Sequence, residues 1–266
     1  MNAIIWYHYQ ETLTGTVFNT FEYYISILEH NPDIQLILVE GSQEVLDMYC
    51  DIYEERYFLD DLDYRKNMMV VPLKQMRYLK FDKVLVLDFG TIPPLNHCLN
   101  AKEIIAVSEL HTDIPAYRFK NRHNVTHYGE MPFVYKDKEY RMKLAFDRFR
   151  PVDKCEEAIF VSSRANKEDI EEKLKLLPNK PVYKKSYKHL TGFFSKWDEM
   201  LYVRSVNWYD PHPRIFLESA FYGKKMHYYN DEDVKDGGWY RWKDVNERGL
   251  EDRTLTKEDE IIKQFI

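Results

Sequence analysis

An arginine and two acidic side chains follow one another closely in residues 210–223. Asp210 and Glu218 are separated by seven residues, with Arg214 midway between them. Prolines fix φ ahead of Arg214, and Gly223 tolerates left-handed backbone, so the pattern predicts a loop and then a short helix. Amides at the helix start, together with Arg214, would bind a phosphate, and Glu218 could accept hydrogen bonds from sugar hydroxyls. The alternative is an ordinary strand–loop–helix corner in which Glu218 faces water.

This segment resembles the donor motif of glycosyltransferases with the GT-B fold, in which two acids separated by seven residues precede a strand. The run Glu218-Ser-Ala-Phe-Tyr-Gly223 matches the second half of that motif. Asp210 stands where the family has glutamate, and Pro-His-Pro replaces its glycine-rich turn. The resemblance implies that Glu218 and Asp210 are catalytic, and that Arg214 and Glu218 bind a nucleotide-sugar donor.

The residues that follow an expected strand at 158–162 are similar to the first loop of the donor domain in the same family. There an arginine and a lysine contact the diphosphate, which implies that role for Arg164 and Lys167. For Lys167, the alternative is the start of a solvated helix with two acids behind it. The resemblance covers most of residues 158–229.

The first half of the chain is similar to the family in architecture more than in motif. Gly15 and Thr16 follow the first expected strand, where retaining GT-B enzymes have a glycine-containing loop near the donor. Small residues there allow a ligand to approach the backbone closely. His111 follows a later strand, where similar enzymes contact the transferred sugar with a histidine. The alternatives are a plain strand–helix turn at Gly15 and a structural hydrogen-bonding role for His111.

Glycosyl transfer breaks the bond between the anomeric carbon and a nucleotide diphosphate, and negative charge grows on the leaving phosphate. Arg164, Lys167 and Arg214 could stabilise that charge, each donor contributing on the order of 3 kcal/mol in a dry site. No Asp-x-Asp pair lies in a site-like context, so we expect no catalytic metal and no cofactor beyond the donor, with a UDP-sugar as a candidate. The motif favours retention of configuration.

Apolar runs and amphipathic stretches alternate along the chain, which predicts an α/β fold with parallel pairing. In the first half, strands are expected at 2–7, 34–39, 68–71, 83–87 and 104–107, with helices at 17–29, 43–57 and around 140–149. In the second half, strands are expected at 158–162, 182–185, 201–205 and 226–229, with helices at 167–177, 193–200, 214–222 and 256–266.

The restart of this alternation near residue 150 predicts two Rossmann-like domains, 1–150 on the acceptor side and 151–266 for the nucleotide sugar. The GT-B resemblance implies that they face each other across a cleft, and that the last helix packs back on the first domain. Cys50, Cys98 and Cys155 are few and widely separated, which is typical of reduced core thiols in a cytoplasmic protein, bacterial or phage-encoded. No apolar run is long enough to span a membrane.

Charge is the only guide to the acceptor. The chain is net −6, yet residues 114–150 hold nine Lys/Arg and four Asp/Glu, so this segment is +5 and the remainder is −11. Aromatic and basic residues interleave at 117–123 and 183–189, as in proteins that bind a phosphate backbone. The chain also resembles small phage glycosyltransferases that modify hydroxymethylated DNA bases, so DNA is one candidate acceptor. A polysaccharide or a lipid-linked sugar is another.

Three classes of function remain open at this stage. The first is a nucleotide-sugar glycosyltransferase, and the second is a binding module for nucleotide sugars or nucleic acid that lacks catalysis. The third is another Rossmann-like enzyme, such as a methyltransferase or epimerase. That class would need a Gly-x-Gly loop after the first strand, and residues 7–15 contain none.

Overall fold

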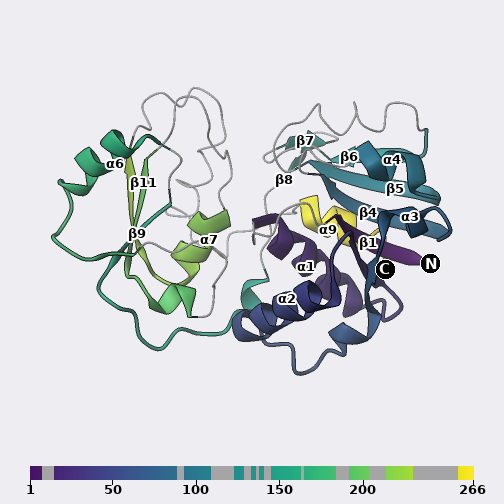
Figure 1. Cartoon of the computed structure of the whole chain (residues 1–266), viewed down its shortest axis with the longest axis horizontal. Helices are drawn as coiled ribbons and strands as arrows, with labels where there is room; N and C mark the ends of the chain where they lie inside the picture. The colour runs from purple at the N-terminus through teal and green to yellow at the C-terminus, as the bar shows by residue number, and fades with distance from the viewer. Residues whose placement is uncertain are drawn as a thin grey trace. The chain divides into compact units, whose positions relative to one another are not determined.

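The computed structural model describes the chain at 1–7, 15–88, 93–108, 123–128, 133–135, 138–140, 145–162, 165–183, 192–203, 214–229 and 257–266. The chain divides into two compact units (Figure 1). The first unit comprises Met1–Phe149 together with Thr254–Ile266, and the second comprises Arg150–Arg253. The C-terminal segment therefore belongs to the same unit as the N-terminal half.

The first unit is built on a six-stranded parallel sheet with strand order β3-β2-β1-β4-β5-β6. Its strands are β1 (Asn2–Tyr7), β2 (Gln35–Val39), β3 (Met68–Val71), β4 (Phe81–Asp88), β5 (Ala101–Ser108) and β6 (Val125–Tyr128). A separate antiparallel pair consists of β7 (Phe133–Tyr135) and β8 (Lys138–Tyr140). The sheet order is that of doubly wound Rossmann-type domains, in which connections run outward in both directions from the centre.

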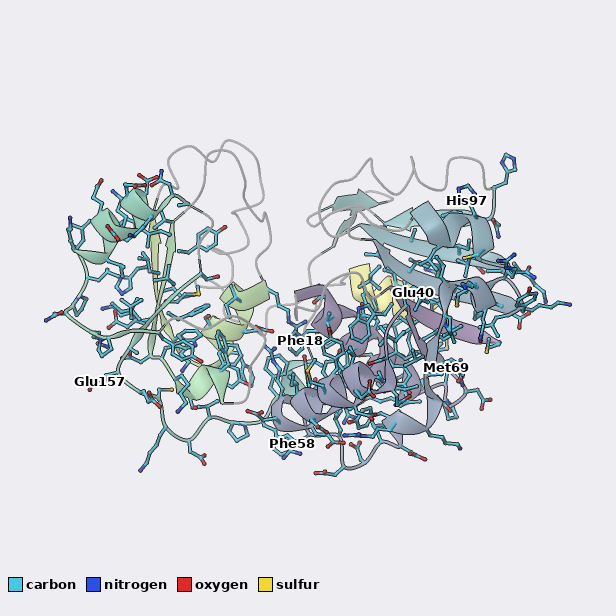
Figure 2. The ribbon with its side chains drawn as sticks, in the orientation of Figure 1. Phe18, Glu40, Phe58, Met69, His97 and Glu157 are labelled. Carbon is cyan, nitrogen blue, oxygen red and sulfur yellow. The ribbon has the colours of Figure 1, made fainter. Side chains whose placement is uncertain are left out.

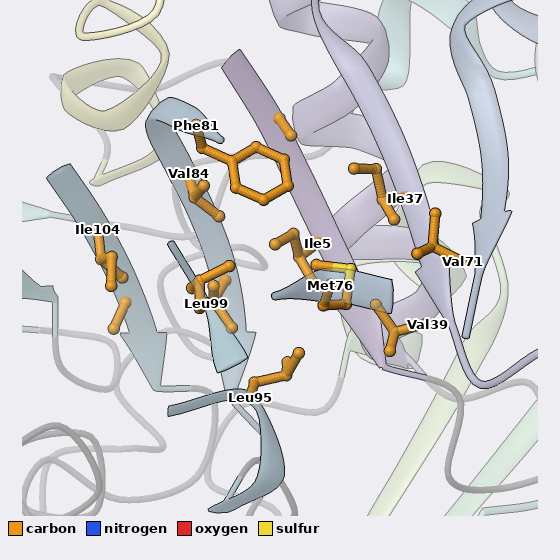
Figure 3. Packing of buried hydrophobic residues seen from close by; sticks show 13 residues of the cluster. Ile5, Ile37, Val39, Val71, Met76, Phe81, Val84, Leu95, Leu99 and Ile104 are labelled. Carbon is orange, nitrogen blue, oxygen red and sulfur yellow. The ribbon is translucent and has the colours of Figure 1, made fainter. Parts of the chain in front are cut away.

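Helices cover both faces of this sheet. On one face lie α1 (Gly15–Leu28) and α2 (Gln43–Arg56). The Trp6 ring of β1 lies 4.6 Å from the Tyr49 ring of α2, and the ring of Phe18 in α1 lies 5.9 Å from that of Tyr53 in α2, measured between centroids. Phe18 is labelled in Figure 2. On the other face lie α3 (Leu73–Met76) and α4 (Pro93–Cys98), whose side chains join the alternate residues of the strands in one apolar cluster (Figure 3). Because helices bury both faces of the sheet, the central strands have largely apolar sequences without polar alternation.

The end of the chain packs onto the first unit. Helix α9 (Lys257–Ile262) contacts α1, and Ile261 and Phe265 are buried. Asn31 Nδ2 donates to the Phe265 carbonyl oxygen at 2.8 Å, and Lys83 Nζ donates to that of Gln264 at 2.7 Å. These contacts attach the last ten residues to the sheet of the first unit.

The second unit holds a four-stranded parallel sheet with order β10-β9-β11-β12. Its elements are β9 (Ile159–Val161), α6 (Lys167–Leu174), β10 (Val182–Tyr183), the 3-10 turn η3 (Phe193–Ser195), β11 (Glu199–Val203), α7 (Arg214–Phe221) and β12 (Lys225–Tyr229). Helix α6 packs on the face that carries Leu201 and Val203. Ser219 of α7 lies against Met200 on the opposite face, with Oγ 3.7 Å from Sδ. This sheet too has helices on both sides.

The α/β class with parallel sheets is confirmed, but two expected helices are wrong. Only Phe193–Ser195 is helical, as one 3-10 turn, because Asp198 and Glu199 already donate their amides to the Ala158 carbonyl and extend the chain into β11. The aromatic rings of Phe193 and Trp197 pack on Phe160, and they do not form one face of a helix.

The second wrong helix is the one expected around 140–149. Residues 138–140 form β8, and Phe146–Arg148 form a single 3-10 turn, η2. Phe149 pairs with Tyr57 in an antiparallel bridge. Arg148 is held there by ion pairs to Glu29 and to Asp61, the latter at 2.9 Å. These long-range contacts override the local helical pattern.

Candidate functional site

The four-stranded sheet has a topological switch point between β9 and β11. From β9 the chain runs through α6 to β10 on one side, whereas β11 continues through α7 to β12 on the other. In open α/β sheets ligands bind beyond the carboxyl ends of the strands at such a point. The residues that follow β9 and β11 are therefore the ones placed to line a ligand site. These are the two segments that the sequence singled out.

Arg214 and Glu218 form a buried pair in the helix that follows β11. Arg214 is the first residue of α7 and is 5% exposed, and Glu218 is 4% exposed. Arg214 Nε donates to Glu218 Oε1 one turn along the helix. The alternative in which Glu218 faces water is therefore wrong.

The position of Arg214 is electrostatically unusual. The start of a helix carries partial positive charge, which favours an anion and disfavours a cation. A guanidinium buried there must be compensated by negative charge, and Glu218 supplies it in this structure. A bound phosphate would meet both the helix start and Arg214, so the same arrangement is suited to an anionic ligand.

The end of α7 matches the sequence prediction. Gly223 has φ 64, a left-handed conformation that is easy for glycine and strained for other residues. The Lys224 amide donates to the Ser219 carbonyl oxygen at 2.8 Å, the 6→1 bond of a Schellman turn. This turn sends the chain directly into β12, so α7 is fixed at its end while its start lies at the ligand-binding side of the sheet.

Helix α6 also begins at the carboxyl end of the sheet, but its first turn carries acids where α7 carries Arg214. Asn166 caps it by accepting a hydrogen bond from the Asp169 amide at 2.8 Å, and Glu168 and Asp169 lie in its first turn. Lys167 is 82% exposed in its side chain, with Nζ 3.5 Å from Glu171 Oε1. These features match the solvated-helix alternative for Lys167, because acids already compensate this helix start.

The first unit has its own switch point, between β1 and β4. Gly15 is exposed and begins α1, and Thr16 is the second residue of that helix, so both follow β1 at the carboxyl ends of the strands. Asp88 is the last residue of β4. The backbone of Gly15 therefore lies at the side of the sheet where ligands of Rossmann-type domains bind.

Three predicted site residues, Asp210, His111 and Arg164, lie outside the described residues. So do most of the two basic aromatic segments, 117–123 and 183–189, of which only Tyr183 and His123 are described. The acceptor prediction that depended on those segments is untested. Among the described residues, no group of three or more His, Cys, Asp or Glu side chains is arranged to hold a metal ion.

Glu40, which directly follows β2 and is labelled in Figure 2, was not predicted as a site residue from the sequence. It is the one non-glycine residue in the described chain with positive φ, at 62. Its carboxylate accepts a hydrogen bond from the Leu73 amide at 2.5 Å, at the start of α3. Backbone strain of this kind often marks functional sites, and an acid after the second strand binds ribose in dinucleotide-binding domains. The signal that could have identified Glu40 was its position directly after a buried strand and three residues before the helix expected at 43–57.

A charged network at the amino end of the four-stranded sheet was also not predicted from the sequence. Glu199, at 5% exposure, accepts from Lys180 Nζ at 2.8 Å, and its Oε2 lies 2.5 Å from His227 Nε2. Burial opposes the charge of Glu199, but the hydrogen bonds from Lys180 and His227 outweigh it and hold the pKa of this carboxyl below its ordinary value of 4.5. The network joins the segment before β10 to β11 and β12.

The three cysteines are all free, but only Cys50 is fully buried. Cys98 is half-buried and Cys155 is exposed, so the expectation that all three are core thiols is wrong for Cys155. No described helix is both long and apolar enough to traverse a bilayer. In comparisons with known proteins, the chain matches no family model and no curated protein sequence.

Proposed function

We propose that the chain is a glycosyltransferase of the GT-B class, which transfers a sugar from a nucleotide-diphosphate donor, such as a UDP-sugar, to a hydroxyl acceptor. The second unit would bind the donor, and the first unit would bind the acceptor. The transfer would proceed with retention and without a catalytic metal. The observation that supports this best is the buried Arg214–Glu218 pair at the first turn of α7, beside a switch point of a parallel sheet.

In this proposal, the start of α7 and the guanidinium of Arg214 hold the donor diphosphate and stabilise charge that develops on it as the leaving group departs. Glu218 orients Arg214 and accepts hydrogen bonds from the donor's hydroxyl groups. Arg164 and Asp210, which follow β9 and β11, would complete the site from the neighbouring strand ends. His111, Gly15 and Thr16 would contact the transferred sugar.

Thermal unfolding with a panel of nucleotide sugars tests the donor site. A ligand present at 100 times its Kd stabilises the folded protein by about 2.7 kcal/mol, which raises the Tm of a chain of this size by about 5–10 °C. We expect that shift with a UDP- or GDP-linked sugar and not with the free sugar. Release of the nucleotide diphosphate in the presence of acceptor then separates an enzyme from a binding module.

The variants for this test must keep the fold. Removing one partner of a buried pair destabilises a protein strongly, whereas replacing both with apolar residues is often neutral. Arg214→Met/Glu218→Leu should therefore fold and lose the ligand-induced shift. Glu172→Ala removes an exposed acid that lies 3.0 Å from Lys173 in the same unit, and it should keep the shift. A double variant that still responds to nucleotide sugar in full would refute the proposed donor site.

The acceptor is tested separately. Mobility of a hydroxymethylated DNA duplex in the presence of the protein, measured at two salt concentrations, tests the DNA alternative, because phosphate contacts weaken as salt rises. Retardation that weakens at the higher salt supports DNA as acceptor. Free migration at low salt favours a polysaccharide or lipid-linked acceptor instead.

A second candidate function is favoured by two observations in the first unit. The strand order β3-β2-β1-β4-β5-β6 and the strained acid Glu40 after β2 are features of domains that bind dinucleotides or S-adenosylmethionine. The glycine-rich loop of those domains is missing from residues 7–15. Stabilisation by NAD or S-adenosylmethionine that disappears in Glu40→Ala would support this candidate over the glycosyltransferase.

A further inference from the structure

The one exposed cysteine of the chain lies against a buried lysine. Lys224 is 6% exposed, and its Nζ lies 2.7 Å from the Sγ of Cys155, sixty-nine positions away. The same ammonium donates to the carbonyl oxygens of Phe194 and, at 2.6 Å, of Trp197. Its charge also lies 4.9 Å from the centre of the Trp197 ring.

The ammonium of Lys224 has no carboxylate partner in the part of the chain that the structure describes. Its three hydrogen-bond donors point to two carbonyl oxygens and one sulfur. Within the described residues, no Asp or Glu lies at ion-pair distance from it. A buried charge is normally paired, and the contacts of this ammonium within the described residues are two carbonyl oxygens, the Trp197 ring and the sulfur of Cys155. Cys155 is an exposed residue, so a small reagent can approach it.

The backbone fixes this geometry from both sides. Lys224 follows the left-handed Gly223 and sits in the turn between α7 and β12. The segment that carries Cys155 is tied down where the Glu156 amide donates to the Ser195 carbonyl oxygen at 2.8 Å. Sulfur and nitrogen are therefore held together by structured segments and do not meet by chance rotation of two surface side chains.

We propose that Cys155 is a site of oxidative modification, at which a peroxide converts the thiol to a sulfenic acid that Lys224 holds by hydrogen bonding. The sulfur attacks one peroxide oxygen, an S–O bond forms and the O–O bond breaks. Sulfur loses two electrons to the peroxide, and with hydrogen peroxide the second oxygen leaves as water. Exposure and adjacent positive charge are the two properties that make a cysteine reactive in this way.

The other two cysteines are internal controls. Burial raises the pKa of the Cys50 thiol to about 11, and burial also raises the pKa of Cys98. Thiols of this kind are present as thiolate to a small extent near neutral pH, so they react slowly. The three sites in one folded chain can thus be compared under identical conditions. The proposal does not depend on the glycosyltransferase assignment.

The test treats the intact protein with a low molar ratio of hydrogen peroxide in the presence of a 1,3-diketone that traps sulfenic acids. Peptide mass spectrometry then measures the tag at each cysteine. We expect tagging of Cys155 to exceed that of Cys50 and Cys98 by about tenfold or more. Equal tagging at Cys98, or none at Cys155, would overturn the proposal.

A pair of lysine variants tests the role of the ammonium. Lys224→Met removes the charge that contacts sulfur, and tagging of Cys155 should fall several-fold. Lys196→Met removes a nearby charge that pairs with Glu156 at 2.5 Å and does not contact the sulfur, so tagging should persist. If tagging of Cys155 changes to the same extent in the two variants, the ammonium of Lys224 does not promote the reaction. Should Lys224→Met unfold, Cys50 would become tagged as well, and the comparison within the unaltered chain remains decisive.

Discussion

The two ends of the four-stranded sheet each carry a buried carboxylate, and the two are partnered differently. At the amino end, Glu199 is held by Lys180 and His227, which come from the segment before β10 and from β12. At the carboxyl end, Glu218 pairs with Arg214 of its own helix. The first network ties separate strands together, whereas the second pair, by itself, joins no two strands.

We interpret this difference in partners as a difference in the role of the two carboxylates. A charge network that links several strands contributes to the stability of the sheet. A cation at the start of a helix works against the helix dipole, so the position of Arg214 is compatible with an anionic ligand in addition to Glu218. We therefore interpret the network at the amino end as stabilising the sheet, and the proposed donor site would lie at the carboxyl end. Four measurements test this contrast.

The largest effect is expected for Arg214→Ala. This change leaves Glu218 buried without its arginine, and loss of one partner of a buried pair costs about 3–5 kcal/mol of unfolding free energy. Arg214→Met/Glu218→Leu should recover most of that loss. Urea unfolding of the three proteins measures both. A double variant as unstable as Arg214→Ala would mean that the pair is a structural element, like Glu199.

A smaller loss, of about 2 kcal/mol, is expected for Glu199→Gln, because hydrogen bonds to a charged group are weakened. The folded-state pKa of Glu199 is lowered, so its stabilisation is present above its ordinary pKa of 4.5 and is lost as pH falls through the lower folded value. The stability difference between the unaltered chain and Glu199→Gln should therefore shrink below pH 4.5. A difference independent of pH would contradict the network.

Asn166→Ala should destabilise the second unit by about 1 kcal/mol, because it removes the cap of α6. Asn166→Ser is the control, since serine caps about equally well and adds no charge beside Asp169, and it should retain most of the stability. Chemical unfolding measures both. Neither variant should alter the response to nucleotide sugar if the ligand contacts α7 and not α6.

The smallest effect is expected for Lys167→Ala. Its ion pair with Glu171 is exposed, and pairs of this kind on a helix contribute about 0.3–0.5 kcal/mol. The thermal shift caused by nucleotide sugar distinguishes the two interpretations of this residue. An unchanged shift means that Lys167 is a solvated helix residue, and a lost shift returns it to the diphosphate site.

Much of the fold could be predicted because strands and helices leave a pattern of apolar residues over a few neighbouring positions, which the sequence shows directly. The strands expected at 2–7, 68–71 and 226–229 are present, because runs of apolar and aromatic residues mark them, and Gly223 ends α7 where its sequence indicates. The helix expected at 193–200 failed because its aromatic residues pack on Phe160, which lies far away in sequence. Tertiary packing of that kind overrides local propensity.

Residue spacing was sufficient to predict that the chain alternates strands and helices, and that Arg214 and Glu218 fall one turn apart in a short helix. The three-dimensional structure was needed to show that both side chains are buried and that Lys224 contacts Cys155. It was also needed to show that α6 and α7 diverge from a switch point between β9 and β11. Burial, strand order and contact depend on residues brought together from distant parts of the chain, which spacing does not encode.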